Sequence, residues 1–205
     1  MSIVLIGAPA AGKTRVGKRL ARRLGKAFID TDHAVTEKHG PIPEIFSVHG
    51  EPHFRTLERA EVAAALTEDA VVSLGGGAVL DPLTQADLGS ATVVLLTISA
   101  EAVSERIAND KRPLVTGIDA WKALVASRSE LYERLADVVI DTSFRKPDVI
   151  VEEIVGILAE RGIAVPTIDL PRIDLPTIDV PGEPGSSVSP APEDDPLSGE
   201  QETHS

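Results

Sequence analysis

The chain has 205 residues, of which 25% are charged and 42% hydrophobic, and this fits one globular domain with extensions or two small domains. A net charge of −12 argues against general binding to nucleic acid or an anionic membrane, and the absence of cysteine excludes disulfides, thiolate metal ligands and cysteine catalysis. Because the first apolar run stops at Gly7 and no run approaches the roughly 20 apolar residues of a membrane span, we expect a cytoplasmic protein.

The first predicted strand, residues 3–6, runs directly into a loop that matches G-x-x-x-x-G-K-[ST] at every fixed position. Its glycines allow successive N–H groups to point inward at a helix N-terminus, which makes a site for phosphate. A glycine-rich turn that only packs a helix against a strand is the alternative, but the strand–loop–helix setting favours nucleotide binding. The candidate nucleotide-binding residues of this loop are Gly7, Ala10, Ala11, Gly12, Lys13 and Thr14.

Two carboxylates, Asp30 and Asp32, follow the second predicted strand at residues 27–29. Because they lie two apart on an extended segment, they point to one side. One would orient Mg²⁺ through water, and the other would accept a hydrogen bond or a proton from a substrate hydroxyl. The alternative is an Asx turn or a helix N-cap, since a helix is predicted to start near His33. The neighbouring phosphate loop favours the functional interpretation.

Residues 51–58 are typical of a helix start, with Pro52 in the first turn. Arg55 and Glu58 lie three apart on one face of this helix, so Glu58 would hold the guanidinium in place. An arginine held in this way suits a carboxylate of a ligand. From the spacing alone, a surface ion pair is an equally good interpretation.

Strands alternate with helical patterns through residue 164. Three further strands are predicted at residues 70–74, 91–98 and 137–140, and Gly75, Gly76 and Gly77 follow the first of these. Such alternation predicts an α/β fold with a parallel sheet covered on both sides, in which ligands bind beyond the carboxyl ends of the strands. The glycine triplet would let the backbone approach a ligand closely, although a tight turn is the structural alternative.

Four arginines of the domain are candidate ligands for anionic groups, although a solvated surface position is the commoner role. Arg112 lies in a polar stretch between two helical segments, and we interpret about residues 107–119 as a mobile lid. A lid arginine closing on phosphates would stabilise the charge of a phosphoryl-transfer transition state. Trp121 and Tyr132 are interpreted as packing residues. The other three arginines are Arg106, Arg128 and Arg145.

Composition changes abruptly near residue 165. Residues 166–205 contain eight of the chain's 15 prolines and nine acidic residues against a single Arg172. Proline at every fifth residue of an imperfect repeat prevents a continuous helix, and the stretch after residue 181 is too polar to form a core. We therefore interpret residues 1–164 as the domain and 165–205 as a mainly disordered, acidic, proline-rich tail. A neutral solubilising extension is favoured over docking of the tail to a partner, which the sequence does not identify.

Together, these segments resemble the shikimate kinases, small P-loop kinases with the nucleoside-monophosphate-kinase fold. The resemblance covers almost all of residues 1–162 and implies a three-layer α/β/α domain whose five-stranded parallel sheet has the order 2-3-1-4-5. It also implies ATP-dependent phosphorylation of the 3-hydroxyl of shikimate, in the route to chorismate and the aromatic amino acids. The resemblance rests, in chain order, on residues 7–14, Asp30-Thr31-Asp32, residues 45–58, 74–79, Arg112-Pro113-Leu114 and 128–132.

The resemblance also implies roles for the donor-side residues. Thr14 would ligate one Mg²⁺, and Asp30 would support the ion through water. Lys13 and Arg112 would neutralise phosphate charge as catalytic residues, the latter from the lid. Arg106 and Arg145 would flank the adenine of ATP, with a looser sequence match at Arg145.

On the acceptor side, the resemblance implies a substrate-binding segment at about residues 32–60. Asp32 would bind the shikimate hydroxyls and act as the catalytic base. Arg55 and Arg128 would bracket the carboxylate, and the backbone of Gly76 and Gly77 would line the pocket. Two departures from the family pattern are Pro43, where alanine is common, and Val115, where leucine is usual.

Two other interpretations of the function remain. One is another small hydroxy-acid kinase of the gluconate type, and the other is a non-catalytic nucleotide-binding module. Two arginines facing one carboxylated acceptor favour a hydroxy acid, and the intact Lys13 and Asp32 favour catalysis. We expect a monomer whose partners are ATP and shikimate, with no nucleic acid and no membrane.

Overall fold

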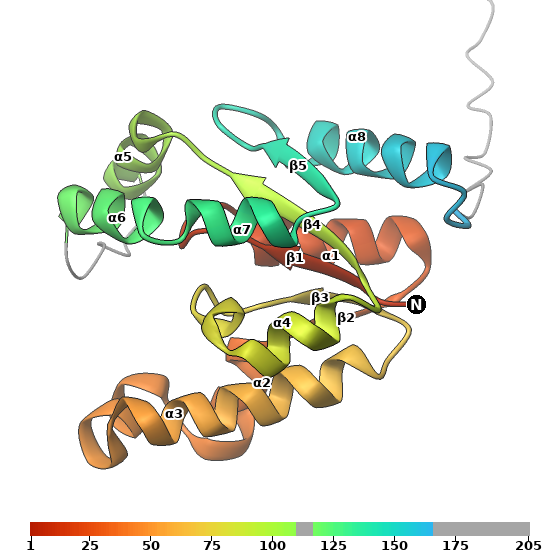
Figure 1. The fold of residues 1–205 in the computed structure, drawn as a ribbon. Coiled ribbons are helices and arrows are strands. Elements are labelled where there is room, and N and C mark those ends of the chain that lie inside the picture. Colours follow the sequence, from red (N-terminus) through yellow and green to blue (C-terminus); the bar gives the residue numbers. More distant parts are fainter. Residues whose placement is uncertain (110–116, 166–205) are drawn as a thin grey trace, which may run out of the picture. The chain divides into compact units, whose positions relative to one another are not determined.

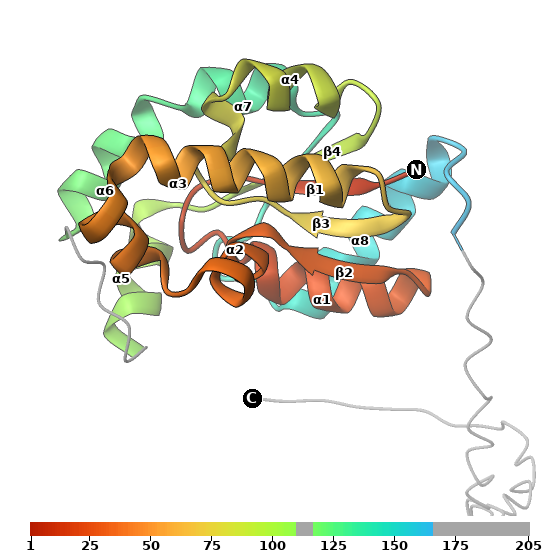
Figure 2. The ribbon, with the colours of Figure 1, turned by 90° about the horizontal axis from the view of Figure 1, so that it is seen from below.

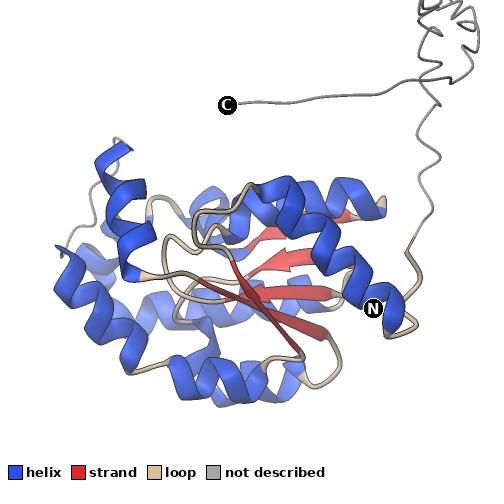
Figure 3. Cartoon of the chain, turned by 90° about the horizontal axis from the view of Figure 1, so that it is seen from above, coloured by secondary structure: helices blue, strands red, loops and turns tan. Residues whose placement is uncertain are grey.

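The computed structural model describes residues 1–109 and 117–165. Five parallel strands form one sheet in the order β2-β3-β1-β4-β5, as expected (Figures 1 and 3). All five predicted strands are confirmed, each to within one residue at its ends. Their bounds are β1 Ile3–Ile6, β2 Ala27–Asp30, β3 Ala70–Ser73, β4 Thr92–Thr97 and β5 Val138–Asp141.

The central strand β1 is buried on both faces, which explains its continuous apolar sequence. It pairs with β3 on one side and with β4 on the other, so that Val4 lies between Val72 and Val93. Ile3 and Leu5 pack into one core cluster, and Val4 and Ile6 pack into another on the opposite face. Covering both faces of a parallel sheet with helices gives the predicted three-layer arrangement.

One face of the sheet is covered mainly by α1 (Lys13–Leu24) and α8 (Pro147–Glu160), and the core cluster on that face includes residues of both. The opposite cluster draws on α3 (Ile42–Leu66), α4 (Pro82–Leu88) and α7 (Ser129–Leu135). Figure 2 shows α3, α4 and α7 on one side of the strands and α1 on the other. The remaining elements are α2 (Thr31–His39), the short 3₁₀ helix η1 (Ala78–Leu80), α5 (Ala100–Asn109) and α6 (Gly117–Ala126).

Helix α3 consists of two helical segments that meet at Gly50, whose φ of 79° is not helical. Pro52 lies in the first turn after this break, where the missing N–H of proline is tolerated. The helix start predicted near residue 51 is therefore confirmed within a longer element. Pro43 lies in the first turn of the first segment, so α3 begins there despite this departure from the family pattern.

The predicted lid and tail are described only at their margins. Helix α5 extends to Asn109 and α6 begins at Gly117, so both ends of the predicted lid are helical. Arg112 and residues 166–205 lie outside the described residues. The limits of the domain and of the tail stay predictions. Within residues 1–109 and 117–165, no helix combines the length and the apolar character needed to cross a membrane.

Candidate active site

The phosphate loop leaves the carboxyl end of β1 and enters α1 in a conformation that requires glycine at two positions. Gly7 has a φ of 136°, and a Cβ placed there would lie 2.2 Å from the backbone oxygen of Leu96. Gly12 has a φ of 90° and directly precedes α1. Both φ values lie in the range that side chains rarely adopt. The two fixed glycines of the motif are therefore explained by backbone geometry.

Lys13, the first residue of α1, extends across this loop. Its ammonium Nζ donates hydrogen bonds to the carbonyl oxygens of Gly7, at 2.8 Å, and Ala8, at 3.1 Å. Burial lowers the pKa of Lys13 to about 8, and the negative charges of Asp32 and Asp30 oppose this shift. Burial disfavours the charged form of a lysine, and here it outweighs the attraction of the two carboxylates. The ammonium is thus placed where phosphate oxygens would restore its preference for the charged state.

Thr14 and Asp30 join the phosphate loop to the end of β2. The Thr14 hydroxyl donates a 2.7 Å hydrogen bond to Oδ2 of Asp30. Oδ1 of the same carboxylate accepts from the backbone N–H of His33 and caps α2. Both interpretations of Asp30, as an N-cap and as a residue of the site, are therefore compatible. A hydroxyl and a carboxylate are oxygen donors of the kind that Mg²⁺ binds in proteins, so the two residues fit this ion.

Asp32 lies in the first turn of α2 and is close to both halves of the site. Burial raises the pKa of Asp32, as does the neighbouring Asp30, while Lys13 and Arg55 act in the opposite direction. A Cβ on Gly75 would lie 2.4 Å from Oδ1 of Asp32, so the carboxylate packs against bare backbone. A carboxylate with a raised pKa beside a phosphate site suits a general base.

Arg55 is held by carboxylates of its own helix, α3, and one of them is Glu58, as the spacing predicts. Its Nη1 donates to Oε2 of Glu58 at 2.5 Å, and its Nη2 donates to Oε1 of Glu51 at 2.9 Å. A Cβ on Gly77 would lie 2.4 Å from Nη1 of Arg55. The guanidinium therefore lies directly over the glycine triplet, and the absence of a side chain at position 77 makes room for it.

The carbonyl of Gly76 anchors the second predicted arginine. It accepts a hydrogen bond from Nη1 of Arg128 at 2.9 Å and another from the Tyr132 hydroxyl at 2.6 Å. The positive charge of Arg128 also reaches Glu58, where it counters the raised pKa that burial gives that carboxyl. Arg55 of α3 and Arg128, the residue that directly precedes α7, thus reach the same glycine triplet.

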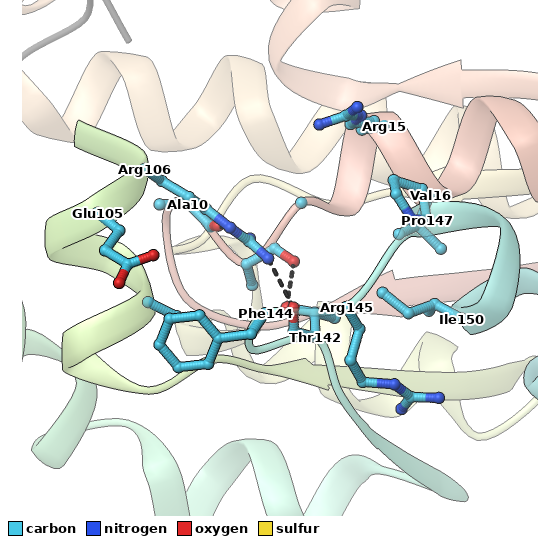
Figure 4. Close-up of a pocket in the computed structure, with 13 residues that line it drawn as sticks. Ala10, Arg15, Val16, Glu105, Arg106, Thr142, Phe144, Arg145, Pro147 and Ile150 are labelled. Atoms are coloured by element: carbon cyan, nitrogen blue, oxygen red, sulfur yellow. Dashed lines mark hydrogen bonds between the residues drawn. The ribbon is translucent and has the colours of Figure 1, made fainter. Parts of the chain in front are cut away.

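A second region of the site is a cavity of about 540 Å³ beside the phosphate loop (Figure 4). Arg106 of α5 lines it and donates to the carbonyls of Ala10, at 2.8 Å, and Thr142, at 2.6 Å. Arg145 also lines the cavity, but its guanidinium pairs with Glu153 and with the carbonyl of Asp141. The two arginines predicted to flank a base therefore share one cavity.

Among the described residues, the predicted site residues come together in three adjoining groups. Lys13, Thr14 and Asp30 lie at the loop. Arg112 lies outside the described residues, and no group of three or more His, Cys, Asp or Glu in the described ranges could hold a metal ion. The acceptor group is Asp32, Arg55, Gly76, Gly77 and Arg128; the donor-side cavity includes Ala10, Ala11, Gly12, Arg106 and Arg145.

Three residues contribute more to the site than the sequence indicates. Gly75 makes room for Asp32 and Glu58, and Tyr132 shares the Gly76 carbonyl with Arg128. Trp121 donates from its indole Nε1 to the carbonyl of Pro9 in the phosphate loop, at 2.9 Å. A signal for the last two exists, since buried Tyr and Trp usually need a hydrogen-bond partner, but it does not name the acceptor.

Most of the chain is similar in sequence and in structure to known proteins. The family model described as shikimate kinase matches residues 9–159. A shikimate kinase from Mycobacterium avium (strain 104) is 49% identical over 158 residues, which cover 74% of this chain and 90% of that protein. The structure of shikimate kinase from Acinetobacter baumannii in complex with shikimate has a TM-score of 0.73 at 32% identity, over 80% of this chain and 95% of that chain.

A more distant likeness concerns the fold alone. A gluconokinase from Sinorhizobium meliloti 1021 has a TM-score of 0.56 at 23% identity, over 78% of this chain and 92% of that chain. The family model, in contrast, spans more than half of this chain and includes every described candidate site residue except Gly7. With the phosphate loop, the paired arginines and the glycine triplet all in place, the chain belongs to the shikimate kinase family.

Proposed function

We propose that this protein phosphorylates the 3-hydroxyl of shikimate with ATP, giving shikimate 3-phosphate and ADP, in the route to chorismate and the aromatic amino acids. The observation that carries the proposal is the convergence of Arg55 and Arg128 on the glycine triplet next to Asp32. Two guanidinium groups suit the carboxylate of the acceptor, and Asp32 suits its hydroxyls. The phosphate loop directly beside them supplies the donor side.

In the proposed reaction, the acceptor hydroxyl oxygen attacks the γ-phosphorus and the bond from that phosphorus to the β,γ-bridging oxygen breaks. ADP leaves with the bridging oxygen, and the hydroxyl proton passes to a carboxylate oxygen of Asp32. Lys13 neutralises charge on the phosphates, while Arg55 and Arg128 fix the acceptor so that its hydroxyl faces the phosphorus. Because a base must be deprotonated and burial raises the pKa of Asp32, turnover falls as the pH drops through that raised pKa.

One Mg²⁺ is proposed to accompany ATP. The Thr14 hydroxyl and the Asp30 carboxylate would hold it, the latter through water, and the 2.7 Å hydrogen bond between these two groups supports the pairing. When bound, the ion supplies further positive charge to the phosphate oxygens. Arg112 is proposed as the lid arginine that adds to this charge.

The oligomeric state and location belong to the same proposal. Lys13, Asp32, Arg55 and Arg128 meet within one chain, and we expect a monomer to be active. The reaction consumes ATP, and we expect the protein to act in the cytoplasm.

The decisive experiment measures coupled ADP release with shikimate, quinate, gluconate and AMP as acceptors. Shikimate should stimulate release well above the ATP-only background, and Lys13→Ala should abolish the stimulation. Stimulation by gluconate instead would favour the other hydroxy-acid kinase. Nucleotide binding without stimulation by any acceptor would favour the non-catalytic module. Full shikimate-dependent turnover by the Lys13→Ala variant would refute the mechanism.

A further inference from the structure

Phe144 is displayed at the donor-side cavity in an unusual backbone conformation. Its φ is 53°, in the left-handed region that bulky side chains rarely adopt, and the residue is 65% exposed. Apolar burial therefore does not account for an aromatic residue at this position. Sparsely populated backbone conformations persist where the surrounding structure enforces them, and they concentrate at ligand-binding sites.

The loop between β5 and α8 is fixed on both sides of Phe144. The backbone N–H and the hydroxyl of Ser143 both donate to Oδ1 of Asp141, at 3.0 and 2.7 Å. The hydroxyl oxygen of Ser143 also accepts from the backbone N–H of Ser99, at 2.8 Å, which ties the loop to the end of β4. On the other side, Nη1 of Arg145 donates to the carbonyl of Asp141 at 2.9 Å. These contacts hold the backbone that carries the ring.

The ring lines the same cavity as Arg106 and the phosphate loop. Figure 4 shows Phe144 and Arg106 among the residues around the cavity, while the Arg145 guanidinium points away from both. The guanidinium of Arg106 is fixed by hydrogen bonds from Nη1 to the carbonyl of Ala10 and from Nη2 to the carbonyl of Thr142. The cavity is therefore lined by an aromatic residue and a guanidinium that is held in place, together with the apolar side chains of Val16, Ala102, Pro147 and Ile150.

We propose that Phe144 is a base-binding residue of the donor site, on whose ring the nucleobase of the phosphate donor stacks. The inference rests on the proposed function, because the phosphate loop must place a nucleotide beside this cavity. Aromatic rings and guanidinium groups stack on flat π surfaces, and every nucleobase has a flat π face. Stacking on Phe144 thus contributes affinity without choosing between purines, so the variant effect should be the same for adenine and guanine nucleotides.

The test compares Phe144→Ala with a matched surface variant, Val149→Ala. Val149 is also exposed and apolar, and it lies in α8 outside the residues that line the cavity. Calorimetric titration with ADP, GDP and inorganic tripolyphosphate separates the base from the phosphates. Phe144→Ala should weaken the affinity for ADP and for GDP by about tenfold. The affinity of Phe144→Ala for tripolyphosphate should change by less than about twofold. The affinities of Val149→Ala for all three ligands should also change by less than about twofold.

Two results of this titration would overturn the inference. One is unchanged ADP affinity in Phe144→Ala. The other is an equal loss of ADP and tripolyphosphate, which would assign the effect to the phosphate loop instead of to the base. Neither result depends on the acceptor. If shikimate failed to stimulate ADP release, this would contradict the proposed function but would not contradict the stacking of the base on Phe144.

Two more variants give readouts other than turnover. Phe144→Trp should keep nucleotide affinity and show fluorescence quenching by ADP beyond that of the wild type, in which Trp121 is the only tryptophan. Phe144→Gly should raise the melting temperature by about 2–4 °C while weakening ADP, because glycine adopts this φ without strain. Absence of extra quenching in the tryptophan variant, or unchanged ADP affinity in the glycine variant, would contradict the assignment.

Discussion

Arg55 and Glu58 form an ion pair of 2.5 Å in which the glutamate side chain is only 4% exposed. The same guanidinium pairs with Glu51 at 2.9 Å, but this second glutamate is 61% exposed. The two carboxylates therefore bind the same arginine, but one of them is buried and the other is exposed to solvent. Exposed pairs contribute little because water screens them, whereas removal of one partner from a buried pair is costly. This contrast provides a matched pair of variants.

Glu58→Gln should raise the KM for shikimate by about tenfold and leave the KM for ATP within about twofold, because the loss is confined to the positioning of Arg55. Glu51→Gln should change either constant by less than about twofold. Steady-state kinetics with each substrate varied in turn measures both effects. Equal effects of the two variants on the KM for shikimate, or an equal rise in the KM for ATP, would show that Glu58 does not act through the acceptor site.

The glycine triplet gives a second prediction, since its members differ in the space around them. A Cβ on Gly77 would lie 2.4 Å from Nη1 of Arg55, whereas a Cβ on Gly76 would meet nothing closer than Pro9 at 3.5 Å. Gly77→Ala should therefore displace Arg55 and raise the KM for shikimate by about tenfold. Gly76→Ala should leave Arg55 in place, so it should raise the KM for shikimate less than Gly77→Ala does. Steady-state kinetics of the two variants checks the difference, and a larger effect at Gly76 would contradict the steric explanation.

The sequence predicts those parts of the site that depend on strand ends and motif spacing. In a parallel sheet, residues that directly follow strands must lie at one edge, so Asp30 and Gly75 could be placed near the phosphate loop from pattern alone. The i, i+3 pairing of Arg55 with Glu58 follows from helix geometry in the same way.

Contacts between side chains and groups of different segments are not predicted, because no local rule specifies them. The pairing of Arg145 with Glu153 depends on how α8 packs after β5. The hydroxyl of Tyr132 could have met any carbonyl within reach, and only the fold selects Gly76. Phe144, with its φ of 53°, follows Ser143, whose hydroxyl oxygen accepts a hydrogen bond from Ser99, just beyond β4. Such features require three-dimensional structure.

The depressed pKa of Lys13 predicts proton uptake when a nucleotide binds. With a pKa of about 8 in the free protein, Lys13 is neutral in about one tenth of the molecules at pH 7 and in about half at pH 8. Bound phosphates favour the ammonium and raise its pKa, so binding takes up a proton in the molecules where Lys13 was neutral. Uptake should therefore grow from pH 7 to pH 9, above the range in which phosphate groups themselves titrate.

Titration calorimetry of ADP in buffers with different ionisation enthalpies measures this uptake. Lys13→Arg is the control, since a guanidinium remains charged throughout this pH range. The control should show no pH-dependent uptake at whatever affinity it retains. A flat profile in the wild type, or the same profile in the control, would mean that another group is responsible.

The hydrogen bond from Trp121 to the Pro9 carbonyl links α6 to the phosphate loop across 112 residues of sequence. The indole is 5% exposed, so Trp121→Phe removes a donor from a partly buried carbonyl as well as some packing volume. Loss of such a hydrogen bond costs about 1 kcal/mol, which corresponds to about a fivefold weaker affinity if the loop must be ordered to bind nucleotide. We expect this weakening for ADP, with shikimate affinity unchanged.

The packing loss needs its own control, for which Ile154→Val is suitable. Ile154 is fully buried on α8 in the same core cluster as Trp121, and its truncation costs about 1 kcal/mol of folding stability without touching the phosphate loop. Both variants should lower the free energy of unfolding, but only Trp121→Phe should weaken the affinity for ADP. Equal ADP affinities in the two variants would show that Trp121 stabilises the core alone. A selective loss would show that α6, the helix that follows the predicted lid, positions the donor loop through a single hydrogen bond.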